Sequence, residues 1–320
     1  MVNPLSAANM WWVQQEVERA GESFSAVAQF ARPERNPRLA VEAHVALGGA
    51  ARRGGDWETS ARAYSQAAYV ADTLGDRPGV LTVQIGIANT YMAKGNLPEA
   101  QTILDDVLVQ ASDQGLSEVQ GYALHSRAAL AQRKGDNAEG VKLAYEALNL
   151  TNKRADRDLV LEDIAAMLTE LGLHDAARDA HLILAATAQS QLVRGSATVN
   201  LMELASFDGM KDVFDGYARE LAASPLCPWI RAHYLLFLGE GFSRFDRLEA
   251  AEEALNEAVA FSEMNEIHQV SFKAQTAITR LRSVERSTTT FTPPPAWVPT
   301  EVESVVRALS DLRKTALAAA

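Results

Sequence analysis

The sequence has few of the features that mark secreted or membrane-embedded proteins. Its 320 residues contain a single cysteine, Cys227, so no internal disulfide can form. This scarcity agrees with a reducing compartment, and we expect a cytoplasmic protein. No apolar run approaches the ~18 residues of a membrane-spanning helix. The first residues lack the basic start and apolar core of a signal peptide. We therefore expect no membrane association.

Basic residues are also scarce relative to acidic ones. The chain has 30 Lys and Arg against 41 Asp and Glu, which gives a formal charge of −11. Nucleic-acid binding requires clustered Lys and Arg to neutralise phosphates. The composition therefore predicts no nucleic-acid partner.

Catalytic and metal-binding motifs are missing. The sequence contains no GxSxG, Walker loop, CxxC or HExxH pattern, and no two of its six histidines have the i, i+4 spacing of helical metal ligands. The lone Gly-x-Gly, Gly239–Gly241, is better explained by close helix packing than by dinucleotide binding. We accordingly predict no catalytic residue, no cofactor, no metal site and no enzymatic activity.

What the sequence does contain is a repeat. The stretch GDWETSARAYSQAA at Gly55 returns in character as GNLPEAQTILDDVL at Gly95 and GDNAEGVKLAYEAL at Gly135. Each reads as a turn followed by a helix. Equivalent turn markers are assigned at Gly21, Gly55, Gly95, Gly135, Gly172, Gly209 and Asp246. Their steps of 34, 40, 40, 37, 37 and 37 residues differ by about one helical turn, which a longer helix can absorb.

Small residues recur at fixed offsets from these markers. Nine of 12 residues are Gly or Ala at the positions seven before and five after the last six markers. These residues are Gly48, Ala88, Ala128, Ala165, Met202 and Gly239, then Ser60, Ala100, Gly140, Ala177, Phe214 and Ala251. Two helices joined by a short turn can approach to about 8 Å only when one side of the contact is small. The pattern therefore predicts stacked antiparallel helix pairs.

Two segments carry a family resemblance. LGGAARRGGDWETSARAYSQAA (Leu47–Ala68) and LGEGFSRFDRLEAAEEALNEAV (Leu238–Val259) resemble the tetratricopeptide repeat (TPR), in a variety with repeats of 37–40 residues. The resemblance implies an all-α fold, a right-handed α-solenoid of about seven repeats. We expect a degenerate N-terminal capping repeat over 1–38 and the solenoid over 39–286.

The C-terminal region differs in composition. Prolines and threonines over 287–300 predict an extended linker, and 301–320 predicts a tethered amphipathic helix. Its apolar stripe consists of Val302, Val305, Val306, Leu309 and Leu312. Three placements remain open for this helix: docking on the chain's own solenoid, folding into the concave groove, or forming a homodimer contact through 301–320.

The TPR resemblance also suggests where a partner binds, because the first helix of each pair lines the concave side in that family. Ser196, Val199 and His233 belong to this face. Its candidate partner-binding residues are Arg52, Arg53, Asn89, Tyr122, His125, Arg133, Glu162, Glu203 and Glu240. Arginines come early and glutamates late, so we expect the acidic part of a peptide to face the early repeats.

These features lead to a functional expectation. By resemblance, the chain is a non-enzymatic TPR scaffold or adaptor that binds a protein or peptide in its groove. The alternative is the ligand- or peptide-sensing arm of a bacterial-type regulatory system. A third alternative is an enzyme whose site has no recognisable motif.

Overall fold

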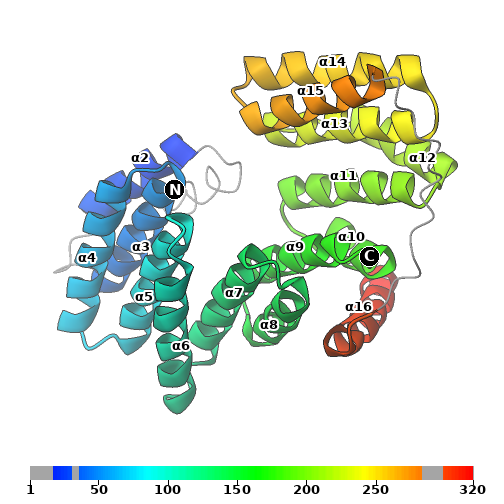
Figure 1. Ribbon diagram of the computed structural model, residues 1–320. Helices are drawn as coiled ribbons and strands as arrows, with labels where there is room; N and C mark the ends of the chain where they lie inside the picture. Colours follow the sequence, from blue (N-terminus) through cyan, green and yellow to red (C-terminus); the bar gives the residue numbers. More distant parts are fainter. Residues whose placement is uncertain (1–16, 31–35, 283–297, 320) are drawn as a thin grey trace. The chain divides into compact units, whose positions relative to one another are not determined.

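The computed structural model describes residues 17–30, 36–282 and 298–319, and its regular elements are helices (Figure 1). Within these ranges the helices are α2 (Val17–Phe30), α3 (Pro37–Arg53), α4 (Trp57–Thr73), α5 (Arg77–Ala93), α6 (Leu97–Asp113), α7 (Ser117–Arg133), α8 (Asn137–Leu150), α9 (Arg154–Glu170), α10 (His174–Thr187), α11 (Gln191–Phe207), α12 (Lys211–Ala222), α13 (Pro228–Arg244), α14 (Leu248–Met264), α15 (His268–Arg282) and α16 (Thr300–Ala319). The predicted all-α fold is confirmed. Much of the predicted cap and nearly all of the predicted linker lie outside the described residues.

A 20-residue period underlies the first half of the fold. Helices α3 to α7 have 17 residues each and are joined by three-residue turns. The middle residue of each turn is a glycine with φ between +64° and +82°, a region that glycine enters without steric strain. Two such segments make up each 40-residue repeat. The later markers Gly172, Gly209 and Asp246 also have positive φ, which confirms them as turns.

N-terminal capping reinforces these turns. The residue after the glycine is Asp56, Asp76, Asn96 or Asp136, and its side-chain oxygen accepts a hydrogen bond from the backbone N–H three residues later, at 3.0–3.4 Å. Such caps satisfy amide groups that have no partner within the helix. Each turn therefore both stops one helix and starts the next.

The predicted marker at Gly21 is wrong. Gly21 lies inside α2, which continues unbroken from Val17 to Phe30. A glycine at the expected spacing is therefore not sufficient for a turn. The lack of an N-cap side chain does not distinguish Gly21, because the turns at Gly115, Gly172 and Gly209 also form without a side-chain cap.

The chain divides into two compact units, Met1–Asp163 and Ile164–Ala320, whose boundary lies inside α9. In the first unit, α3 packs on α5 and α5 on α7; in the second, α11 packs on α13 and α13 on α15. The helices that follow them, such as α4, α6 and α14, pack mainly on these first helices. In a stack of helix pairs, the first helices of successive pairs contact one another along one side of the stack. We call the surface that these first helices form in each unit the first-helix face.

Glycines at the contacts within helix pairs leave space, here called glycine notches, that a large side chain of the facing helix fills. A Cβ built on Gly48 would lie 2.8 Å from the Tyr64 ring, and one on Gly239 would lie 2.6 Å from Leu255. In both cases the residue seven before the marker receives the large residue nine after it, as the offsets predict. A Cβ on Gly241 would lie 2.2 Å from the Phe214 ring. The Gly-x-Gly segment is therefore a packing feature.

The C-terminal helix α16 packs on α10 within the second unit (Figure 1). Val302, Val305 and Leu309 are buried, and Arg313 pairs with Asp179 of α10 at 2.8 Å. Of the three placements considered, the structure thus has the helix docked on the chain's own helices. Because α10 is the second helix of its pair, this contact leaves the first-helix face of the unit uncovered by α16.

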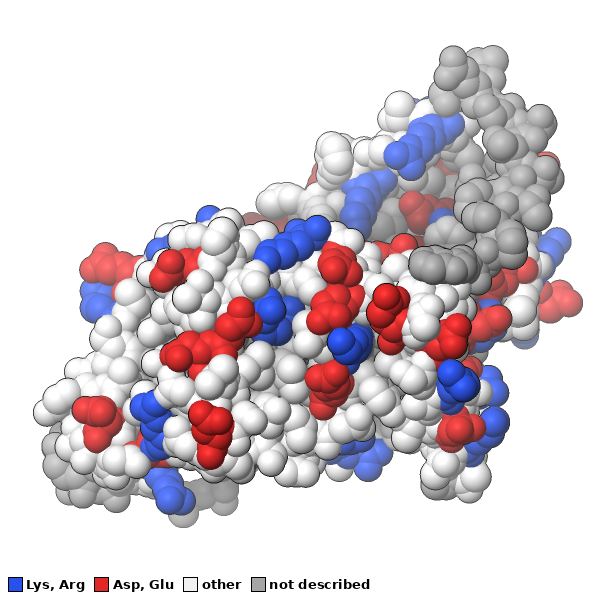
Figure 2. Space-filling view, turned by 60° about the horizontal axis from the view of Figure 1, so that its bottom comes forward, with Lys and Arg blue, Asp and Glu red and all other residues white. Residues whose placement is uncertain are grey.

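On the face shown in Figure 2, acidic and basic side chains of the described residues are interspersed. None of the described helices is long and apolar enough to cross a membrane.

Candidate functional site

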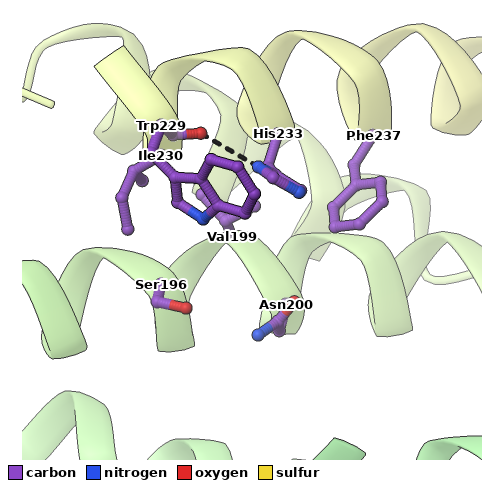
Figure 3. A pocket seen from close by; sticks show the side chains of 7 residues that line it. All are labelled: Ser196, Val199, Asn200, Trp229, Ile230, His233 and Phe237. Carbon is purple, nitrogen blue, oxygen red and sulfur yellow. Dashed lines mark hydrogen bonds between the residues drawn. The ribbon is translucent and has the colours of Figure 1, made fainter. Parts of the chain in front are cut away.

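A pocket opens on the first-helix face of the second unit, between α11 and α13 (Figure 3). Its volume is about 200 Å³. It is lined by Ser196, Val199 and Asn200 from α11 and by Trp229, Ile230, His233 and Phe237 from α13. The pocket therefore has polar groups on the α11 side and a mainly aromatic wall on the α13 side.

The aromatic wall follows from helix geometry. Trp229, His233 and Phe237 recur every four residues, so they share one face of α13. The Trp229 and His233 ring centroids are 4.5 Å apart, and those of His233 and Phe237 are 6.0 Å apart. Pro228, at the first position of α13, is tolerated because that residue needs no amide donor. The helix thus begins one residue before the wall does.

The central residue of the wall, His233, is held in one tautomer. Its Nδ1 lies 2.9 Å from the carbonyl oxygen of Trp229, which can only accept a hydrogen bond. Burial lowers the pKa of His233, with a further decrease from Lys273, despite the favourable bond to the carbonyl. The ring is therefore neutral at pH 7, with Nδ1 protonated and Nε2 as an acceptor. The wall carries no fixed charge.

The pocket has an ionic end. Glu203 follows Asn200 by three residues on α11, and Glu240 follows Phe237 by three residues on α13. Residues three apart lie on the same helix face, so both carboxylates lie about one turn beyond the pocket. Arg244 lies 3.4 Å from Glu240, with both side chains 29% exposed. This end therefore combines two carboxylates with a nearby guanidinium.

Contacts on α11 hold Arg244 in place. Its Nη1 donates to the Ser206 hydroxyl at 2.8 Å, and its guanidinium carbon lies 4.0 Å from the Phe207 ring centroid. The stacking is a cation–π contact, and the guanidinium is thus engaged on several sides. Its charge is shared among these partners.

Glu203 has an unusual protonation equilibrium. Burial raises its pKa to about 7, with a further increase from Glu240, and this outweighs the attraction of Arg244 and Lys273. The carboxyl is therefore near half-protonation at neutral pH. Perturbed carboxyls of this kind cluster at functional sites.

Two predicted residues of the first unit take part in a separate polar cluster. The Tyr122 hydroxyl lies 2.9 Å from both Glu118 and Asp156 and 3.2 Å from Lys153. Burial and the nearby Asp156 raise the pKa of Tyr122, so the hydroxyl stays protonated. His125 Nε2 lies 2.7 Å from Asp163. These contacts join α7 to α9 on the first-helix face.

The other predicted residues are more dispersed. Arg52 lies beside the Tyr64 hydroxyl in the interior of its helix pair. Asn89 and Glu162 are partly buried, whereas Arg53 and Arg133 are exposed at the ends of α3 and α7. Of the predicted set, the structure brings together Glu203 with Glu240, and Tyr122 and His125 along α7.

Sequence reasoning placed Ser196, Val199 and His233 on this face but missed four pocket residues. These are Asn200, Ile230, Trp229 and Phe237. A signal existed for the last two, because PWIRAHYLLF places Trp, His and Phe four residues apart. Asn200 had no comparable signal.

The described residues hold no group of three or more His, Cys, Asp or Glu placed to bind a metal ion. The geometry instead offers a small aromatic pocket, two hydrogen-bonding side chains and a mixed ionic end. Such a site can bind a ligand through shape, hydrogen bonds and charge.

Comparisons with known proteins add little. No protein-family model matches the sequence, and no curated protein matches it. One matching solved structure is the crystal structure of the P58(IPK) TPR domain, with 10% identity over 98% of this chain and 97% of that chain. The TM-score of this match is 0.25. The described helices pack as pairs of sequence neighbours, the arrangement of an α-helical repeat protein.

Proposed function

We propose that this chain is a non-enzymatic repeat scaffold that binds a protein or peptide along its first-helix faces. The observation that carries the proposal is the pocket between α11 and α13. Its aromatic side chains are partly buried, and aromatic residues are enriched at the centres of protein interfaces. Stacked repeats characteristically use such surfaces for extended partners.

The arrangement of the core also supports this proposal. Large residues such as Tyr64 and Leu255 fill glycine notches inside the helix pairs. Trp229, His233 and Phe237 instead line an open pocket. The Trp229 and Phe237 rings pack with one side against the core and leave the other side open to the pocket, and apolar surface left accessible in this way favours a role in binding.

Affinity purification from the native host, followed by mass spectrometry, tests the proposal. A protein recovered in stoichiometric amount supports a scaffold, and a bound short peptide supports the alternative of a sensing arm. The control is a variant in which Asn200→Phe fills the pocket. Recovery of the same partners at the same level with this variant would argue against the pocket as the binding surface.

The arginines of the first unit provide a second test. Reversing Arg53 and Arg133 to Glu is expected to weaken partner binding at low salt, because both side chains are exposed. Arg52 is a poorer choice for reversal, since it lies beside Tyr64 and its loss would also disturb the helix pair. Unchanged affinity at low salt would show that Arg53 and Arg133 do not contribute to partner binding.

A further inference from the structure

The pocket and its ionic end together indicate the chemistry of a ligand. Building on the proposed function, we propose that the pocket binds an apolar side chain of a partner peptide, and that Glu203 and Glu240 pair with a lysine or arginine of the same peptide.

The size of the pocket favours a side chain over a cofactor. Its volume of about 200 Å³ is below the ~300–1,000 Å³ usual for pockets that enclose drug-sized ligands. Trp229 and Phe237 provide apolar surface, with Ile230 and Val199 completing the walls (Figure 3). A leucine, methionine or phenylalanine side chain would bury its apolar surface against these groups.

The polar groups in the pocket suit a peptide main chain. Asn200 offers both an amide donor and a carbonyl acceptor, and Ser196 offers a hydroxyl. The neutral His233 ring presents an acceptor at Nε2, since its Nδ1 is bound to the Trp229 carbonyl. Amide groups next to the inserted side chain can therefore be hydrogen-bonded rather than left unsatisfied.

The ionic end selects a cation. Arg244 is bound by Ser206, Phe207 and Glu240, so its charge is already engaged beside one of the two carboxylates. Burial raises the pKa of Glu203, although Arg244 and Lys273 both act to lower it. An ammonium or guanidinium group from the ligand would pair with Glu203 and Glu240 in this partly buried setting, whereas an acidic ligand would place a further negative charge beside them.

The test is a selection of random 12-residue peptides, displayed on phage, against the full chain. Enriched sequences are expected to combine an apolar residue with Lys or Arg a few positions away. For the tightest synthetic peptide, the double variant Glu203→Gln, Glu240→Gln should weaken binding about ten-fold, by fluorescence anisotropy. Changing the peptide's basic residue to Met should weaken binding to the wild type but not to the double variant, as in a double-mutant cycle.

Two further variants complete the design. Asn200→Phe should abolish binding of the selected peptide, because the new ring occupies the pocket. Glu253→Gln, on the exposed face of α14, removes one carboxylate elsewhere and should leave binding unchanged. Circular dichroism of each variant verifies that the helical fold is intact.

The outcomes separate this inference from the proposed function. Enriched peptides without a basic residue, or equal binding by the double variant, would overturn the ligand assignment and leave the scaffold proposal standing. If the peptides bind the Asn200→Phe variant equally well, the pocket is not their binding site, but the proposal of a scaffold stands. Failure to enrich any peptide would count against both.

Discussion

The most informative single perturbation is Glu203→Gln, an uncharged side chain of nearly the same shape. In the folded protein the pKa of Glu203 is raised to about 7, from an ordinary value of 4.5. Between these values the folded state binds more protons than the unfolded state. With respect to this group, folding is therefore most favourable below pH 4.5, where Glu203 is protonated in both states. Its contribution to the free energy of unfolding falls as the pH rises towards 7.

The magnitude follows from the same two values. The gap between 4.5 and about 7, at about 1.4 kcal/mol per pH unit, amounts to about 3 kcal/mol. The glutamine amide has hydrogen-bonding groups of its own to satisfy, which reduces the gain. We expect Glu203→Gln to stabilise the protein by about 1–3 kcal/mol at pH 8 and by close to zero at pH 4.5.

Urea unfolding followed by far-ultraviolet circular dichroism at several pH values between 4.5 and 8.5 measures this difference. The exposed-site variant Glu253→Gln is the control for the loss of one negative charge and should show little change with pH. A Glu203→Gln effect that is independent of pH, or that matches the control, would refute the reasoning that burial dominates the environment of Glu203.

Further predictions concern packing and turns, each measured as a change in the free energy of unfolding by urea titration. Gly241→Ala should destabilise the protein by about 1–3 kcal/mol, because its Cβ would lie 2.2 Å from the Phe214 ring. Gly216→Ala, a helical site with no atom within 4 Å of the new Cβ, should instead stabilise it by about 0.5–1 kcal/mol, and a loss at both glycines would contradict the packing argument. Gly95→Ala should destabilise the protein by about 1 kcal/mol, because φ there is +82°; no loss would show that the turn tolerates a side chain. Leu309→Ala should destabilise the contact between α16 and α10 by about 2–4 kcal/mol and speed hydrogen exchange in α16, whereas unchanged exchange would mean that α16 does not depend on this contact.

The repeat was predictable because its signals are local. A glycine with positive φ and an Asp or Asn beside it act within about four residues, so the turns at Gly55, Gly95 and Gly135 could be recognised one by one. Gly21 shows the limit of this reasoning. It is a glycine at a plausible spacing, yet the helix runs through it.

The charge partners were harder to predict. Arg127 of α7 lies 2.9 Å from Asp105 of α6, a pairing that no local pattern in the sequence indicates. Nor could the sequence distinguish the contact of Arg52 with Tyr64 from an exposed position on the groove. In both cases the arginine's partner is a side chain from another helix.

The sequence by itself determined the helices, their turns and the small residues that let them pair, because these depend on neighbours along the chain. Three features required the folded chain: Ser196 and Asn200 face an aromatic wall 29 to 41 residues further along the sequence, burial alters the ionisation of Glu203, and α16 packs on α10. The physical reason is that cavities, desolvation and docking are properties of surfaces from separate helices, and they arise only when the stack has formed.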